Sequence, residues 1–519
     1  MNALWKKIKQ DPLVWVLAGI LCVYFGAIAL INFSGRPSFY NTDMYTDVLF
    51  SARAWEGKSL LPEGWLFGNQ LYVVATPALA TLLHLFTGDH LLTMAAAACI
   101  FSVLVAWGFD WMLRPVVADK TARAFGLVVF MTLPLFFGDS VGTENGWQLF
   151  FTMCAYYACY IFNVFLAFGC YIRSLEKTDR RLWMTVAVTC VISFCTGVQS
   201  LRQTAVMTVP LLGLTVLRLL WKLTRKESWK DAPLAVAGAV SVSNLLGYLS
   251  RSLIEFEQTE IFGELAVAEY TGFLPSLKAS VLTMLDLLRC EEPGDYLVLC
   301  VLLLACVLAA VELVRKAGER GVCLLILLAF GVLAIGFVDV VTTIFVRQIY
   351  YFLLYPLLAF LMAYGFANRK KLVRWGILGL MVPLMLIPSM IALKDICMQA
   401  YFAKYDPYYE VSDYLVENGY TTLYSVWNHG EKVAVASDLQ IEAGYWDTRG
   451  LAPVGYLCNP RVYEAEAEGC VYITEAAVFA DALVSAAAEL GVELTLLEYF
   501  PVSDTYLFTA PVNVMQIQQ

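Results

Sequence analysis

The sequence predicts an α-helical polytopic membrane protein of about 11 transmembrane helices, followed by a small C-terminal α/β domain. The first observation behind this prediction is composition. The chain of 519 residues is 60% hydrophobic and 15% charged, whereas soluble proteins carry roughly 25% charged residues. The second is that long stretches contain no charge at all. The third is the placement of the basic residues, which predicts the orientation of the helices in the membrane.

The run from Leu13 to Phe33 is long enough to cross ~30 Å of hydrocarbon as a helix. No small-residue cleavage site follows it, so we expect a retained first span rather than a signal peptide. The eleven expected spans are Leu13–Phe33, Leu91–Leu113, Ala124–Gly138, Trp147–Ile172, Leu182–Val198, Thr204–Leu220, Ala232–Leu249, Tyr296–Val314, Val322–Phe345, Ile349–Phe366 and Trp375–Leu393. The apolar run Val73–Phe86 is shorter and contains Pro77, so it is expected to lie along the membrane surface.

Basic residues gather at one side of this map. The N-terminus and the loops after the second, fourth, sixth, eighth and tenth spans hold 22 of the 35 Lys and Arg residues. The positive-inside rule assigns these short loops to the cytoplasm. The N-terminus is then inside, and the C-terminus and the first loop are outside.

Residues 394–519 differ from the rest of the chain, because short strand-like and helix-like patterns alternate there. We expect residues 1–393 to form the membrane domain, with 34–90 as its first outer loop, and 394–519 to form an extracytoplasmic α/β domain. Cys458 and Cys470 are a candidate disulfide if that segment lies outside the cell. With three His in the chain, a His-rich metal site is disfavoured.

The first outer loop opens with two carboxylates, Asp43 and Asp47, in "NTDMYTDV". If this stretch is helical, both lie on one face just above the membrane. Such a pair can hold a cation, or one carboxylate can raise the pKa of the other so that it serves as a base. The alternative is that Asp43 caps a helix and Asp47 faces water.

Three further acids are candidates. Asp139 and Glu144 occupy the outer turn between spans three and four, where a solvated turn is the alternative. Asp339 lies inside span nine, and a carboxylate within the membrane needs a partner. Arg347 is the expected partner, either as a structural ion pair or as part of a substrate contact.

Arg202 and Arg347 are cations at the outer boundary, where the positive-inside rule disfavours them. A lipid phosphate would explain them, because a guanidinium forks onto phosphate oxygens. Snorkelling to ordinary headgroups is the alternative. In the tail, Trp427, Asn428, His429, Trp446 and Asp447 would suit a carbohydrate surface, or the tryptophans would pack in a core.

Together these features resemble the GT-C class of polytopic glycosyltransferases, in particular bacterial members related to the protein mannosyltransferases and the aminoarabinose transferases. The likeness rests on the topology, on the stretch from Thr42 to Phe86 with its acidic pair and its G-W-x-x-x-x-x-L segment, and on the tail from Val411 to Glu442. The adjacent Asp–Glu dyad of some relatives is not present.

The resemblance implies a transferase that takes a sugar from a polyprenyl-phosphate donor and gives it to a cell-envelope glycan, lipid or protein, with inversion. It implies that Asp43, with Asp47 as second choice, acts as base or metal ligand, so a divalent cation is a possible cofactor. It implies that Arg202 and Arg347 hold the donor phosphate. We expect membrane lipids but no nucleic acid as partners. Two other hypotheses are a flippase for lipid-linked glycan and a non-catalytic envelope assembly protein.

Overall fold

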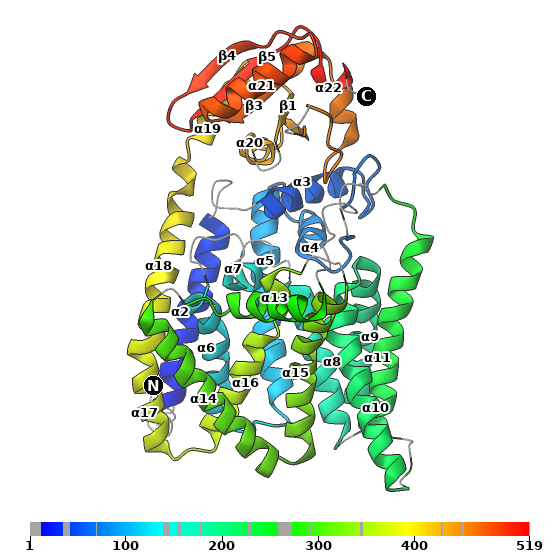
Figure 1. Ribbon diagram of the computed structural model, residues 1–519, viewed down its shortest axis with the longest axis vertical. Helices are drawn as coiled ribbons and strands as arrows, with labels where there is room; N and C mark the ends of the chain where they lie inside the picture. The colour runs from blue at the N-terminus through cyan, green and yellow to red at the C-terminus, as the bar shows by residue number, and fades with distance from the viewer. Residues whose placement is uncertain are drawn as a thin grey trace.

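The computed structural model describes residues 12–34, 42–68, 70–138, 146–152, 157–176, 178–226, 228, 231–257, 272–290, 292–342, 346–426, 429–447 and 451–517, with only the main chain at 42, 43, 146, 148 and 149. A bundle of long helices carries a small sheet domain at one end (Figure 1). The predicted fold class, a polytopic helical protein with a C-terminal α/β domain, is confirmed.

Within the described residues, nine helical stretches are long and apolar enough to cross a membrane. They are α2 (Pro12–Ser34), α5 (His90–Leu113), α9 (Arg180–Gln199), η2 with α10 (Thr204–Thr224), α11 with η3 (Ala232–Leu253), α14 (Pro293–Lys316), α15 (Gly318–Val341), η4 with α16 (Gln348–Ala367), and the stretch Lys371–Glu417 that contains α17, η5 and α18. The multi-pass character of the chain is therefore confirmed.

The two other expected spans correspond to α6 (Lys120–Phe136) and α8 (Ala158–Ser174), which have 17 residues each. At 1.5 Å per residue they are about 26 Å long, slightly less than the ~30 Å hydrocarbon core. Nearly all of their residues are buried, so protein rather than lipid surrounds them.

The expected continuous span from Trp147 to Ile172 is wrong. A short helix α7 (Gly146–Phe151) ends before α8 begins. The Ser102 hydroxyl of α5 donates a hydrogen bond of 2.5 Å to the carbonyl of Phe151, so this carbonyl is satisfied from a neighbouring helix.

The last membrane helix is longer than expected. It begins with α17 (Lys371–Met381), passes through one π-helical turn, η5 (Val382–Leu386), and continues as α18 (Ile387–Phe402). Pro383 lies in the π turn, where the helix accommodates a residue that cannot donate the usual helical hydrogen bond. After this turn the helix continues past Leu393 and leads directly to the sheet domain, as Figure 1 shows.

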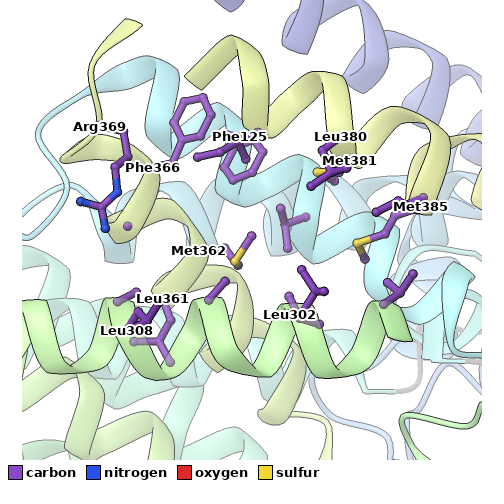
Figure 2. A pocket seen from close by; sticks show the side chains of 18 residues that line it. Phe125, Leu302, Leu308, Leu361, Met362, Phe366, Arg369, Leu380, Met381 and Met385 are labelled. Atoms are coloured by element: carbon purple, nitrogen blue, oxygen red, sulfur yellow. The ribbon is translucent and has the colours of Figure 1, made fainter. Parts of the chain in front are cut away.

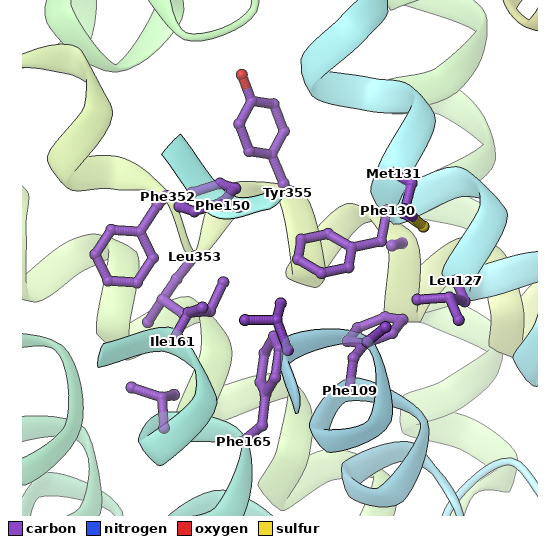
Figure 3. Close-up of a cluster of buried hydrophobic side chains, with 14 of the residues drawn as sticks. Phe109, Leu127, Phe130, Met131, Phe150, Ile161, Phe165, Phe352, Leu353 and Tyr355 are labelled. Carbon is purple, nitrogen blue, oxygen red and sulfur yellow. The ribbon is translucent and has the colours of Figure 1, made fainter. Parts of the chain in front are cut away.

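The centre of the bundle is filled by aromatic side chains from α5, α6, α7, α8 and α16 (Figure 3). Phe130 lies 4.9 Å from Phe109 and 6.0 Å from Phe165 between ring centroids. Tilted and edge-on ring contacts of this kind add to the stabilisation from burial. They explain why α6 and α8 need no polar face.

Helices α9 and α11 approach each other through glycines. A methyl group at Gly197 would collide with the carbonyl of Asn244, and one at Gly247 with the carbonyl of Phe194. The Asn244 amide also donates a bond of 3.0 Å to the carbonyl of Ser193. Small residues at the contact and a hydrogen-bonded amide are typical of helix pairs in membranes.

The first outer loop contains two helices. Helix α3 (Thr42–Glu56) lies beneath the sheet domain, and α4 (Thr76–Leu83) begins with Pro77 in its first turn. At eight residues α4 is too short to span, as expected. On the same side of the bundle, α13 (Phe273–Asp286) runs crosswise to α15 (Figure 1).

The C-terminal domain holds one mixed sheet in the order β2-β1-β3-β5-β4. Strand β1 pairs in parallel with β2 and β3, whereas β5 is antiparallel to β3 and β4. The strands are β1 (Thr422–Ser425), β2 (Glu442–Tyr445), β3 (Cys470–Glu475), β4 (Thr495–Phe500) and β5 (Thr505–Thr509), and the helices are α19 (Tyr408–Glu417), α20 (Gly430–Ala436), α21 (Ala477–Glu489) and α22 (Val514–Ile517). The succession β3-α21-β4 shows the alternation of strands and helices that the sequence predicts for this domain.

Cys458 and Cys470, the candidate disulfide, are both buried free thiols. The Cys470 thiol instead donates to the carbonyl of Glu466 at 3.1 Å. Burial raises the pKa of Cys458 to about 12, so this thiol stays protonated at neutral pH.

We predict that Gly197→Ala lowers the midpoint of thermal unfolding in detergent, because the added methyl group forces α9 away from α11. Overpacking of this kind costs about 1–3 kcal/mol. Gly238→Ala on α11 is the matched control, since a methyl group there meets no atom within 4 Å. Equal unfolding midpoints for the two variants would contradict the close approach of the helices.

Candidate active site

The acidic pair opens helix α3, and the stretch is helical as the first-loop hypothesis requires. Positions 43 and 47 are one turn apart and so share a face of the helix. The Asp47 side chain is 1% exposed, and Met44 and Val48 beside it belong to the bundle's hydrophobic core. The alternative in which Asp47 faces water is therefore wrong.

Gln199, at the end of α9, fixes the first loop to the membrane domain. Its amide oxygen accepts hydrogen bonds from the main-chain N–H groups of Val73 (3.2 Å) and Val74 (3.1 Å). Its main-chain carbonyl accepts from Leu71 N–H at 3.0 Å, and its amide nitrogen donates to Tyr160 at 2.9 Å. One fully buried side chain thus satisfies main-chain groups of an irregular segment.

Arg202 lies next to this anchor and is half-buried. Its guanidinium donates 3.3 Å bonds to the Gln70 amide oxygen and the Tyr350 hydroxyl. The guanidinium carbon is 5.3 Å from the ring centroid of Tyr350 and 6.0 Å from that of Tyr157. These partners come from the first loop, the segment before α8 and η4, and they orient the cation at the end of the bundle nearer the sheet domain.

Arg347 and Asp339 lie in the same region but form no ion pair with each other among the described contacts. Asp339 accepts a 3.1 Å hydrogen bond from the hydroxyl of Tyr351, which also bonds to Ser280 of α13 at 2.6 Å. The expected Arg347 partner for Asp339 is therefore replaced by a tyrosine. Arg347 itself is half-buried and precedes η4 (Gln348–Tyr351), the element that carries Tyr350.

Three tyrosines, Tyr350, Tyr351 and Tyr355, lie in η4 and in the first turn of α16, and they do not form an exposed aromatic belt at the membrane surface. Tyr351 and Tyr355 are almost fully buried, and Tyr355 donates a 2.9 Å bond to the carbonyl of Leu287. Of the three tyrosines, Tyr350 alone is half-exposed. Asp139 and Glu144 lie outside the described residues.

The loop meets the C-terminal domain on its other side. Arg53 of α3 pairs with Glu442 of β2, and Arg461 pairs with Glu63 at 3.3 Å. The main-chain N–H of Leu66 donates a 3.0 Å bond to the carbonyl of Cys458. The acidic helix is thus enclosed between the membrane domain and the sheet domain.

The tail residues considered for carbohydrate binding lie in different environments. Trp446 is 5% exposed and packs 6.2 Å from Tyr472 in the domain core, so the core-packing alternative holds for it. His429 lies with its Nδ1 2.8 Å from a carboxyl oxygen of Glu475. Asp447 is exposed, and Trp427 and Asn428 lie outside the described residues.

The pKa of His429 is lowered to about 4 by burial and by the nearby Lys432. The pKa of Glu475 is raised to about 7 by burial and by the neighbouring Asp504 and Asp406. Both shifts oppose charge on the pair, so at neutral pH His429 is a neutral, hydrogen-bonded side chain. This contact therefore provides no fixed positive charge at the domain surface.

The described residues do not offer a complete metal site. No three His, Cys, Asp or Glu side chains in that part of the chain lie close enough to hold an ion. His84 and His90 stack at 4.1 Å between ring centroids, an arrangement that packs α4 against α5. Parallel stacked rings do not direct their nitrogens at a common point.

Several residues of the site were not identified from the sequence. Gln199, Gln70 and Tyr160 form the hydrogen-bonded anchor, and Arg251 donates a 3.0 Å bond to the carbonyl of Gln199. The available signal was the polar group in "GVQSLRQ" at the end of an apolar helix. A buried amide at such an end needs main-chain partners, but the sequence does not say which segment supplies them.

The comparisons with known proteins bear on the fold. No family model matches the sequence, and no curated protein is significantly similar to it. ArnT from Cupriavidus metallidurans in the apo state has a TM-score of 0.57 at 10% identity, covering 97% of this chain and 99% of ArnT. ArnT bound to undecaprenyl phosphate has a TM-score of 0.56 at 12% identity, with 96% and 98% covered.

A third similar structure is the archaeal oligosaccharyltransferase AglB from Archaeoglobus fulgidus, in complex with an inhibitory peptide and a dolichol-phosphate. Its TM-score is 0.49 at 11% identity, covering 87% of this chain and 65% of AglB. ArnT is an aminoarabinose transferase of the GT-C class. The predicted resemblance to that class is therefore confirmed at the level of the fold, through ArnT and over nearly the whole chain.

We predict that Gln199→Leu increases hydrogen exchange at the main-chain amides of Val73 and Val74, which lose their shared acceptor. Each buried N–H left unpaired costs about 1–3 kcal/mol. Gln440→Leu, an exposed amide of the C-terminal domain, is the control. Unchanged exchange at residues 73 and 74 in the Gln199 variant would show that the loop is anchored in another way.

Proposed function

We propose that this protein is an inverting membrane glycosyltransferase that moves a sugar from a polyprenyl-phosphate donor to a cell-envelope acceptor at the outer face. The acceptor is a glycan, lipid or protein of the envelope. The observation that carries the proposal is the fold, which matches ArnT bound to undecaprenyl phosphate over nearly the full length of both chains. Residues 1–393 would hold the reaction, and residues 394–519 would form an extracytoplasmic domain over it.

The geometry of Arg202 supports a site for a lipid phosphate. A half-buried guanidinium at the membrane boundary, held by an amide and a phenol, can present charge and hydrogen-bond donors to a phosphate. Arg347 lies one helical turn before Tyr350, a partner of Arg202, so both cations belong to one region. That region is at the outer end of apolar helices, where a lipid phosphate lies.

The position of α3 supports a site for the acceptor. Asp43 and Asp47 are on the helix that lies between the bundle and the sheet domain. An enclosed carboxylate is less hydrated than one in solution and makes a better base when a neighbour of like charge raises its pKa. The second carboxylate, one turn away, provides that neighbour.

In the proposed reaction Asp43 accepts the proton of an acceptor hydroxyl as its oxygen forms a bond to the anomeric carbon of the donor sugar. The bond between that carbon and the phosphate oxygen breaks, and the polyprenyl phosphate leaves with the electron pair. Arg202 and Arg347 stabilise the negative charge on the leaving phosphate. Asp43 and Asp47 are the residues that would hold a divalent cation at this site.

We predict that Asp43→Asn lowers the transfer rate by about 10²–10⁴-fold, because the amide cannot accept the proton. The assay measures release of polyprenyl phosphate from polyprenyl-phosphate hexoses by purified protein in bilayers with a crude envelope acceptor fraction. Asp413→Asn, on the exposed face of α19, is the matched control. Full activity of the Asp43 variant would refute its role as base, and movement of sugar lipid between leaflets without any release would favour a flippase.

We predict that Arg202→Gln reduces kcat/KM for the lipid donor by roughly tenfold to a hundredfold, the loss of one or two charge-assisted hydrogen bonds. Lys120→Gln removes an exposed cation from the start of α6, at the opposite end of the bundle, and should leave kcat/KM unchanged. The KM of the acceptor is measured in parallel. A loss confined to the acceptor's KM would place Arg202 on the acceptor side of the reaction.

A further inference from the structure

An apolar groove lies at the opposite end of the bundle from the candidate active site. It has a volume of about 300 Å³ and is formed by α6, α14, α16, α17 and η5. Figure 2 shows Arg369 at one end and Met385 at the other, with apolar side chains between them.

The groove extends from the mouth at Arg369 deep into the bundle. Arg369 follows α16 in a loop that the positive-inside rule assigns to the cytoplasm. From there the lining extends along α14 from Ala309 back to Val298, about 17 Å at 1.5 Å per residue. This stretch includes the middle of α14 (Pro293–Lys316), so the groove accepts the length of an acyl chain that enters from the cytoplasmic end.

The mouth of the groove is positively charged. Arg369 and Lys316 both pair with one carboxylate, Glu312, each at 2.9 Å. The Arg369 side chain remains 40% exposed, and Lys370 and Lys371 follow it. Two cations against one anion leave an excess of positive charge where lipid headgroups lie. An anionic headgroup complements this mouth better than a zwitterionic one.

The walls of the groove include adaptable side chains. A methyl group at Gly365 would come within 3.2 Å of the Ala309 side chain, so α14 and α16 lie close together at this glycine and close one side of the groove. Three methionines, Met362, Met381 and Met385, line the groove, and their unbranched side chains adapt to an irregular apolar partner.

We propose that this groove binds one acyl chain of a phospholipid from the cytoplasmic leaflet, with its anionic headgroup against Arg369. The charge at the mouth selects the headgroup, and the apolar wall along α14 accepts the chain. The site lies on the side of the membrane away from Asp43 and Arg202, so it does not depend on the proposed reaction.

The test uses full-length protein exchanged into bilayers containing 1-palmitoyl-2-oleoyl-phosphatidylglycerol or the corresponding phosphatidylcholine. Native mass spectrometry after detergent extraction then counts the retained lipids. The wild type should retain one phosphatidylglycerol, and Arg369→Gln should lower its occupancy at least tenfold. Arg315→Gln is the control, because it removes the same charge from the same face outside the groove.

A second pair of variants tests the groove itself. Ala305→Phe fills the groove and should also abolish retention, whereas Leu304→Phe, on a lipid-facing position of α14, should not. Thermal unfolding confirms that each variant is folded, and the Arg369 comparison stands if Ala305→Phe is not. Equal retention of phosphatidylcholine, equal loss in Arg315→Gln, or retention of an added polyprenyl phosphate in place of phosphatidylglycerol would overturn the proposal.

Discussion

The hydrogen bonds of Gln199 to Leu71, Val73 and Val74 hold an irregular segment against the end of a membrane helix. Main-chain groups in such a segment have no sheet or helix partner, and at the edge of a membrane they have little water. One buried amide solves both problems. Once the segment is fixed, Gln70 is placed beside Arg202, and the remainder of the loop can carry α3 beneath the sheet domain. The candidate site therefore depends on a residue that takes no part in the proposed chemistry.

Much of the fold could be predicted because the membrane imposes simple rules. Apolar length identifies the spans and basic residues identify the sides, and both are local properties of the sequence. The errors occur where tertiary packing replaces lipid. Helices α6 and α8 are short and surrounded by protein, so length alone does not define them. The break between α7 and α8 depends on the Ser102 hydroxyl of a neighbouring helix, which no local pattern reveals.

Less of the candidate site could be predicted, because burial depends on partners distant in sequence. From the sequence, the Asp47 side chain could either face water or belong to a functional site. Only the packing of α3 on the bundle shows that this side chain is buried. Arg202 was identified by its unusual side of the membrane, but its partners lie 132 and 148 residues away along the chain. Trp446 was a candidate for stacking on a sugar ring, but it is a core residue. The sequence does not separate these two roles, because an aromatic side chain can either stack on a sugar or pack in a core.

Arginines at both ends of the bundle are held by contacts from other elements. Arg123, Arg218 and Arg374, at the end away from the sheet domain, pair with Asp110, Asp231 and Asp119. A carboxylate partner offsets the charge of a guanidinium, so these pairs tie helix ends together. Arg202, at the end nearer the sheet domain, donates to an amide and a phenol and lies beside two aromatic rings. These contacts orient a guanidinium at a lipid boundary, and phosphate oxygens are good acceptors for its hydrogen bonds, so the geometry favours a donor site at this end of the bundle.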